Sequence, residues 1–524
     1  MISTTDNKID HIVVLGGGSA GFLAASAIAA KLPEVKLTVV RSKKLGVIGV
    51  GEGTIPSVVT FLHRFLGLDI HEFNRQVRPS IKLGIRYHWG KRPFFNYAFS
   101  PQLTNRPKQL ELPKGYYCKE DFEYADLSAA LMNFGNACVR NRDGSPQFNS
   151  GFAYHLENKT FVDFFERLCD SLKVTKVDAI VDDVEVGPQG VSSLKLDNGQ
   201  SIEADLFIDC SGFRAELIGK ALKEPFIGFD EALFCDRAVV GGWERTNDDH
   251  YAPYTLAETM NAGWAWRIEH DELVNRGYVF CSAFLSDDEA IEEFCKKNPK
   301  IKQPKVIKFT AGVHQRTWVK NVVAIGNAAG FVEPIEATAI GVVCDAVSRL
   351  VRGLSVSNLR LLDLQRDIYN RIQTRHWDKI RDFIAMHYRF NDRLDTSFWQ
   401  MCRNDVELGN AQELVDYYKH VGPDFGFLSA ILKDDIFTAE GYLAMLVGQN
   451  VPYERDVQIT TEMRRKWQQF KNRIAITAEQ GCSMDEYIAF LRQQDESESK
   501  DGKPTEFALS QFDFDTDAGE LNWH

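Results

Sequence analysis

The sequence lacks the cysteine pairs that zinc sites and disulfide frameworks require. Its 10 cysteines are scattered along 524 residues, and none of them stands in a CxxC pair. We therefore expect no metal site and no disulfide bonds. Isolated cysteines of this kind are typical small buried side chains of a protein in the reducing cytosol, so we predict a cytoplasmic location.

A basic stripe and a long uninterrupted apolar run are also missing. The formal net charge of -12 argues against a nucleic-acid partner, although a small anion needs only a few local donors. The first ten residues, MISTTDNKID, lack the basic and then apolar pattern of a signal peptide. The apolar stretch 11–30 is divided by four glycines, which predicts a strand and a helix rather than a membrane span.

The glycines in that stretch form a dinucleotide-binding pattern. Ile12 to Leu15 is a continuous apolar run, as expected for a buried strand, residues 20–32 read as a helix, and residues 37–40 form a second strand. The turn between them fits the fingerprint GxGxxG, whose glycines allow a tight turn, the approach of a pyrophosphate and close packing of helix and strand. The helix start also offers free amides to phosphates. The predicted contacts are Gly16, Gly18, Ser19, Ala20 and Gly21.

One position departs from this pattern. Arg41 stands at the end of the second strand, where an acidic residue usually holds the ribose. Its guanidinium either faces the adenosine phosphate or lies in solvent, and the sequence leaves both alternatives open.

Two later turns favour FAD over NAD. DLFIDCSGFR (205–214) and VVAIGNAAGFVEP (322–334) are strands that run into turns of small residues, and the second turn contains Gly326 and Asn327. Three such turns in this order predict an α/β protein with a Rossmann-type FAD-binding domain like that of glutathione reductase.

From about residue 10 to about residue 455 the chain resembles the flavin-dependent halogenases of the tryptophan type. The paired tryptophans and the run PIEATAIG are the most specific parts of this resemblance. The matching segments are GGGSAG (16–21), VGEGTIPS (50–57), PSIKLGIRYHW (79–89), AYHLENKTFVDFF (153–165), FIDCSGFR (207–214), GWAWRI (263–268), GNAAGFVEPIEATAIG (326–341) and HWDKIRDFIAMHY (376–388).

The resemblance implies an enzyme that uses reduced FAD, oxygen and a halide to make hypohalous acid and halogenate an electron-rich aromatic ring, indole-like or phenol-like. A separate flavin reductase would supply the reduced FAD as a transient partner. An aromatic monooxygenase and a catalytically silent FAD-binding protein are the alternatives. We find no second nucleotide fingerprint, as a single-component monooxygenase that binds NADPH would need. The sequence leaves the oligomeric state open, with a homo-oligomer as one alternative.

Two residues carry the catalytic prediction. Lys82 lies in a strand predicted over 81–89, where alternation alone would put it on an exposed polar face, together with Gly84. The resemblance instead makes Lys82 the essential lysine of the family, and Gly84 would leave space for a ring. Glu336 matches the catalytic glutamate, although a glutamate at a helix start commonly only balances the helix dipole.

The resemblance assigns further residues around this pair. The amides of Thr338 and Ala339 match the halide position, where many family members have glycine second. Trp264 and Trp266 would share one face of a strand and are the motif that separates halogenases from hydroxylases. Glu269 stands where that motif usually has proline. The remaining predicted cofactor contacts are Gly51 and Glu52, in a strap between the flavin and substrate regions, and Ile340.

The domain prediction follows the same order. We expect an FAD-binding domain in two parts, residues 1–225 and 305–360, with a sheet-rich insertion, 226–304, between them. A helical substrate-side region, 361–492, and a disordered tail, 493–524, follow. The stretch LKDDIFTAEGYLAMLVGQNVPY does not clearly match the lid of enzymes that act on free tryptophan. An indole, a phenol, a peptide or a carrier-bound ring therefore stays open as substrate.

Overall fold

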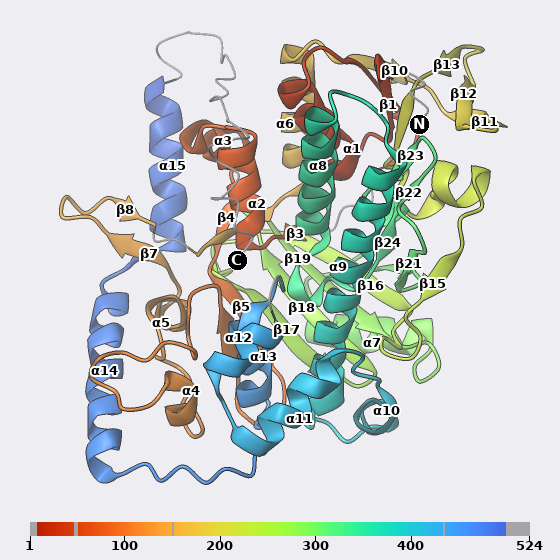
Figure 1. Ribbon diagram of the computed structural model, residues 1–524. Helices are drawn as coiled ribbons and strands as arrows, with labels where there is room; N and C mark the ends of the chain where they lie inside the picture. The colour runs from red at the N-terminus through yellow and green to blue at the C-terminus, as the bar shows by residue number, and fades with distance from the viewer. Residues whose placement is uncertain (1–7, 47–50, 149–150, 433–434, 499–524) are drawn as a thin grey trace.

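The computed structural model describes residues 8–46, 51–148, 151–432 and 435–498. Its first layer is a six-stranded sheet with the order β10-β2-β1-β14-β23-β22, in which only β22 runs antiparallel to its neighbour (Figure 1). The apolar run 12–15 is almost fully buried in its centre, as a parallel sheet covered on both faces requires. Its strands are β1 (His11–Leu15), β2 (Lys36–Arg41), β10 (Thr175–Asp178), β14 (Leu206–Asp209), β22 (Trp318–Val319) and β23 (Val322–Ala324).

Helix α1 (Ser19–Lys31) contacts both α6 (Asn158–Ser171) and α8 (Ala339–Val356) beside this sheet. Residues 21–28 of α1 are all buried, which explains why the sequence there is apolar on every side. No helix in the described ranges is long and apolar enough to cross a membrane.

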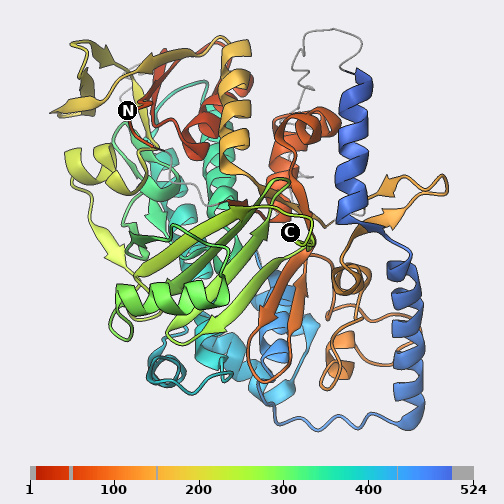
Figure 2. The same cartoon turned by 180° about the vertical axis from the view of Figure 1, so that it is seen from behind.

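A second, seven-stranded sheet has the order β20-β16-β19-β18-β17-β5-β6. Residues 84–98, which we assigned to the first domain, supply two of its strands, so the insertion 226–304 does not form this sheet alone. Figure 2 shows α7 (Asp287–Lys297) across one face, and α9 (Asp363–Phe390) lies on the other. The strands are β5 (Gly84–His88), β6 (Phe95–Ala98), β16 (Arg237–Glu244), β17 (Thr255–Met260), β18 (Gly263–Glu269), β19 (Leu273–Phe280) and β20 (Lys305–Lys308).

The prediction of one strand over 81–89 is wrong. The chain forms β4 (Ser80–Lys82) and then β5, and the break at Leu83 places the two strands in different sheets. The Leu83 amide donates to the carbonyl of Pro253, and its own carbonyl accepts from the amide of Phe99. Strand β4 joins β9 (Ala153–Leu156) and β3 (Glu52–Gly53) in a small sheet between the two large ones.

Short elements complete the framework. The helices are α2 (Pro56–Thr60), α3 (Ile70–Val77), α4 (Lys114–Tyr117) and α5 (Leu127–Phe134). The strands are β7 (Asn136–Arg140), β8 (Pro146–Gln147), β11 (Val181–Gly187), β12 (Gly190–Leu196), β13 (Ser201–Glu203), β15 (Phe226–Gly228), β21 (Gly312–His314), β24 (Gly330–Phe331) and β25 (Cys482–Ser483).

The C-terminal part is helical, as predicted. In Figure 1 its last two helices run along the side of the molecule, next to α5 and α3. The final helix continues to Glu498, past the predicted boundary at residue 492, and the rest of the predicted tail lies outside the described residues. These helices are α10 (Ser397–Asp405), α11 (Ala411–Val421), α12 (Phe425–Ile431), α13 (Thr438–Gly448), α14 (Thr461–Glu479) and α15 (Met484–Glu498).

Candidate functional site

The glycine turn between β1 and α1 has the geometry that a dinucleotide site needs. A Cβ added at Gly16 would lie 2.2 Å from the carbonyl oxygen of Cys210, and one at Gly21 would lie 2.1 Å from that of Gly16. At Gly18, by contrast, no heavy atom of the described chain lies within 4 Å of an added Cβ. The turn is therefore closed at two glycines and open at the third, where a pyrophosphate would approach the start of α1 at Ser19 and Ala20.

The other two glycine-bearing turns lie at the same edge of the sheet. Strands β1, β14 and β23 are parallel neighbours, so the turns that follow them meet at their carboxyl ends. Gly326 has a φ of 66°, and an added Cβ would lie 3.0 Å from Cβ of Ala20. Asn327, the next residue, is exposed there. These residues can hold a dinucleotide across the edge.

Arg41 does not lie in solvent. Its guanidinium pairs with Glu166 of α6, which Lys176 Nζ also approaches to 3.3 Å. The aliphatic stem of Arg41 packs against Gly17, where an added Cβ would lie 2.5 Å from Cβ of Arg41. The arginine therefore ties the second strand to α6 beside the glycine turn.

Lys82 is fully buried at the end of β4. Its Nζ donates a hydrogen bond to the Thr54 carbonyl at 2.9 Å and lies 5.1 Å from the centre of the Phe99 ring. Burial lowers the pKa of Lys82 to about 7, although the nearby carboxylate of Glu336 acts in the opposite direction. The exposed polar face that alternation predicted is thus wrong for this lysine.

Glu336 ends a short turn, 334–336, and is 1% exposed. Its Oε1 accepts a hydrogen bond from the Tyr87 hydroxyl and lies 2.7 Å from Nε2 of His387. The other ring nitrogen of His387 lies 2.9 Å from the Phe383 carbonyl and must be the donor there, because a carbonyl only accepts. A proton on either His387 Nε2 or the Glu336 carboxyl group then completes the buried pair.

The strap joins the lysine and the glutamate. A Cβ added at Gly53 would lie 3.5 Å from Lys82 Nζ and 3.1 Å from Cβ of Ala337, the residue after Glu336. Gly51, with a φ of 77°, lies against the ring of His270, where an added Cβ would be 2.2 Å from Nε2. Burial raises the pKa of Glu52 to about 7. The structure therefore brings the predicted strap, lysine and glutamate together.

The predicted halide position lies at the start of α8. Ala339 is its first residue, and no side chain of the described residues caps the helix start after Thr338. The left-handed residue is Ala337, with a φ of 55°, so a glycine is not needed at 339. Thr338 and Gly341 line a small pocket together with Ile55 and Ser57 from the strap side. Ile340 instead points into the hydrophobic core.

Trp264 and Trp266 share one face of β18, as predicted, with ring centres 5.9 Å apart. The Trp264 indole N–H donates to Glu333, whereas Trp266 Nε1 has no hydrogen-bond partner in the described structure. The space proposed at Gly84 does not exist, because an added Cβ would lie 2.2 Å from the Tyr97 carbonyl oxygen on β6. Gly84 serves strand pairing and not a substrate ring.

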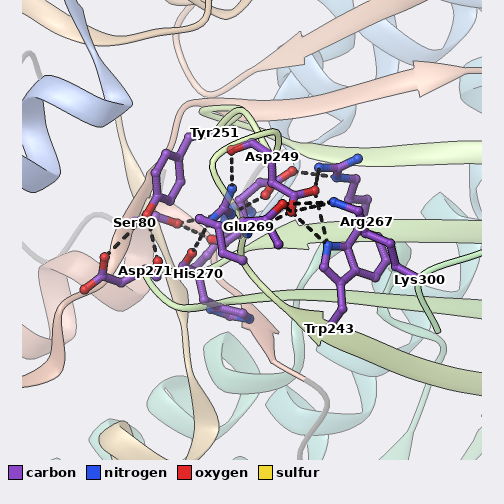
Figure 3. A network of polar contacts seen from close by, with 12 residues as sticks. Ser80, Trp243, Asp249, Tyr251, Arg267, Glu269, His270, Asp271 and Lys300 are labelled. Carbon is purple, nitrogen blue, oxygen red and sulfur yellow. Dashed lines mark hydrogen bonds and ion pairs between the residues drawn. The ribbon is translucent and has the colours of Figure 1, made fainter. Parts of the chain in front are cut away.

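Glu269, which replaces the usual proline of the motif, is the centre of the polar network in Figure 3. Its buried carboxylate pairs with Arg245 and with Arg267, the latter at 2.6 Å. Its backbone carbonyl accepts a hydrogen bond from the Ser80 hydroxyl, two residues before Lys82. The Glu269 side chain thus binds two arginines, whereas the strand that carries the lysine is anchored by the backbone carbonyl, which any residue at this position would supply.

Sequence reasoning missed four side chains of this site: Tyr87, Glu333, His387 and Tyr388. All four stand inside segments that carry the family resemblance, which is the only signal that could have marked them.

The glycine turns at the carboxyl edge of a parallel sheet define a nucleotide-binding α/β protein, and a buried lysine and glutamate adjoin its strap. The family model described as tryptophan halogenase matches residues 11–465, so the chain belongs to the tryptophan halogenase family. The expected α/β fold and the expected enzyme class, flavin-dependent halogenase, are confirmed by this match and by the relatives below.

Tryptophan 7-halogenase RebH of Lentzea aerocolonigenes is 32% identical over 441 residues, which cover 79% of this chain and 82% of RebH. MibH, described as a lanthipeptide tryptophan 5-halogenase, is similar in structure with a TM-score of 0.85 and 33% identity, over 95% of this chain and 96% of MibH. BrvH, a flavin-dependent halogenase from Brevundimonas sp. BAL3, has a TM-score of 0.81 and 28% identity, over 93% of this chain and all of BrvH.

Proposed function

We propose that this protein uses reduced FAD, oxygen and a halide to halogenate an indole-type ring. The observation that carries the proposal is the burial of Lys82 and Glu336 beside the strap, where Gly53 lies next to Lys82 Nζ and to Ala337, the residue after Glu336. RebH is named for tryptophan and MibH for a tryptophan of a lanthipeptide, which favours an indole, free or within a peptide, over a phenol.

The residues at the glycine turns fit a dinucleotide, because the open position at Gly18 adjoins the free amides of α1. Reduced FAD bound there would supply, with oxygen and a halide held near Thr338 and Ala339, the hypohalous acid for the reaction. A separate reductase would deliver the reduced flavin.

Lys82 would act on the hypohalous acid. As an ammonium it donates a hydrogen bond to the oxygen and makes the halogen more electrophilic, and as an amine it can itself be halogenated. Burial keeps its pKa near 7, so both forms are accessible at neutral pH. The surrounding apolar groups exclude water, which would otherwise compete for the reagent.

Glu336 would accept the proton that leaves the ring carbon when the halogen is added. The Tyr87 hydroxyl and His387 hold this carboxylate, and His387 offers a second position for the proton. The balance is simple: the aromatic C–H and hypohalous acid give the carbon–halogen bond and one water.

Mass spectrometry of the products tests this function. The protein is incubated with a flavin reductase, NADH, FAD and oxygen, with and without bromide, against tryptophan, other indoles, a tryptophan-containing peptide and phenols. We expect a brominated product only when both bromide and reductase are present. A hydroxylated product that forms without halide would identify a monooxygenase, and no product despite FAD binding would identify a silent flavoprotein.

Three variants test the residue roles. Lys82→Ala and Glu336→Gln should each lower the halogenation rate at least ~100-fold, because each removes a group that acts on a transferred atom. Lys82→Met keeps an unbranched side chain that is only one atom shorter and lacks the amine, so it controls for loss of packing. All three should still bind FAD, as measured by flavin fluorescence. Turnover like that of the wild type in any of them contradicts the assigned role.

A further inference from the structure

Glu333 stands three residues before Glu336 and is also 1% exposed. Its Oε2 accepts hydrogen bonds from the indole N–H of Trp264 and from the hydroxyl of Tyr388, and its Oε1 has no partner among the described residues. Burial raises the pKa of Glu333 to about 7. A buried carboxyl group is costly and is retained only where its contacts matter.

The donors to Glu333 come from two distant elements. Trp264 lies on β18, in the second sheet, and Tyr388 lies near the end of α9. The residue before Tyr388 is His387, which contacts Glu336. Two consecutive residues of α9 therefore hold the two glutamates of one turn, and β18 holds the turn from another side.

The turn needs such anchors. Ala337, directly after Glu336, has a φ of 55°, a left-handed conformation that is unfavourable for an alanine because its Cβ crowds the backbone. A residue stays in this conformation only where its surroundings enforce it. The same turn leads into Thr338 and the first amides of α8, so its position sets both the glutamate and the proposed halide contacts.

The second tryptophan of the motif provides a contrast. Trp266 is buried beside Trp264, but its N–H has no partner within the described structure, and its ring lies on the backbone of Gly277. Only the first tryptophan of the pair is hydrogen-bonded to the turn.

We infer that Glu333 is a positioning residue, which with Trp264 and Tyr388 fixes the turn that carries Glu336 and leads into α8. The inference rests on the proposed function, because it assigns Glu333 to the halogenation that Glu336 serves. Glu333 does not touch the reacting atoms and acts through the backbone of residues 334–338.

Trp264→Phe and Trp266→Phe form a matched pair, because both remove an indole from the same buried strand and only the first removes a hydrogen bond. We expect Trp264→Phe to lower kcat by about 10- to 100-fold, the effect of a small misplacement of a reacting group. The KM for the aromatic should change less than about threefold, and less halogenated product should form per NADH consumed. Trp266→Phe should lose clearly less kcat. Equal losses in the two variants, or full activity of Trp264→Phe, overturn the inference.

Glu333→Leu and Glu333→Gln separate positioning from charge. The glutamine keeps an acceptor for both donors, so its kcat should exceed that of the leucine variant at least about tenfold. Adding Trp264→Phe to Glu333→Leu should cause little further loss, because the shared contact is already gone. The positioning role is overturned if the kcat losses of Trp264→Phe and Glu333→Leu multiply in the double variant. It is also overturned if a folded Glu333→Gln variant has a kcat as low as that of Glu333→Leu. Circular dichroism and FAD binding report folding for each variant.

The two proposals fail in different ways. A wild-type protein that makes no halogenated product in the screen fails the proposed function itself. A wild type that halogenates while Glu333→Leu matches its rate overturns only the role of Glu333.

Discussion

At the scale of single residues, the site depends on a lysine kept in the protein interior. Burial lowers its pKa to about 7, and the charge of Glu336 opposes this shift because a carboxylate favours the ammonium form. We therefore predict that Glu336→Gln lowers the pKa of Lys82 further. An NMR titration of the protein with 13C-methylated lysines measures this pKa directly. A pKa near 10.5 in the wild type, or one that rises in the variant, contradicts the prediction.

The same burial makes stability depend on pH. The folded chain loses the Lys82 proton near pH 7, whereas the unfolded chain keeps it up to about pH 10.5, so the unfolded state binds more protons between these values. The contribution of Lys82 to stability therefore rises with pH through this range and is least favourable below pH 7. A methionine does not titrate, so the Lys82→Met variant lacks this pH dependence. We predict that its free energy of unfolding, relative to that of the wild type, is about 2 kcal/mol lower at pH 9 than at pH 7. Urea unfolding at both pH values measures it, and an unchanged difference would argue for an ordinary lysine.

The sequence identified Lys82 and Glu336 through segments that match a family, and the structure brings both to one site. It did not identify their partners, because these contacts join residues far apart in the chain. Tyr87 and Glu336 are 249 positions apart, and Tyr87 and His387 are 300 apart. Only the packing of α9 against the second sheet decides which side chains meet, and no local pattern encodes that packing.

At the scale of elements, the turn between β1 and α1 was predicted residue by residue. A fingerprint of three glycines can be recognised from sequence because each glycine is required by its immediate surroundings. In the structure, two of them lie against backbone oxygens and the third faces open space. The strand over 81–89 failed for the opposite reason. Its alternation is genuine, but Leu83 pairs with Pro253 and Phe99, and these distant partners divide the strand between two sheets.

The glycine turn therefore allows a selective test. Gly18→Ala should leave the Tm within about 2 °C of the wild type, because its Cβ meets no atom of the described chain, but should weaken FAD binding at least about tenfold by filling the pyrophosphate position. Gly16→Ala and Gly21→Ala should instead unfold at lower temperature, since each places a Cβ about 2 Å from a backbone oxygen. Calorimetry and flavin titration separate the two effects. Unchanged FAD affinity in Gly18→Ala would place the cofactor elsewhere.

At the scale of the whole molecule, the two large sheets are joined through the small sheet of β3, β9 and β4, which carries Lys82 and the strap. The predicted domain boundaries followed sequence order and did not anticipate that residues 84–98 join the second sheet, because strand pairing between distant segments leaves no local signal. The C-terminal helices extend this arrangement. Helix α14 packs on α5, and α15 packs on α3 and on β4 itself, although most of both helices lies beyond residue 465, where the family match ends.

These two helices should therefore contribute to stability as core elements. Trp467 on α14 is 6% exposed and stacks on Tyr117 at 5.5 Å, and Ile488 on α15 is 3% exposed. Trp467→Ala and Ile488→Ala should each lower the free energy of unfolding by about 2–5 kcal/mol, the cost of emptying a packed site. Ile476 on α14 is 58% exposed, so Ile476→Ala serves as the matched control and should change it by less than about 0.5 kcal/mol. Chemical denaturation measures all three. If the buried and exposed substitutions cost the same, α14 and α15 are not part of the folded core. The expected difference means that both helices belong to it, and that α15, which lies beyond the family match, supports the strand carrying Lys82.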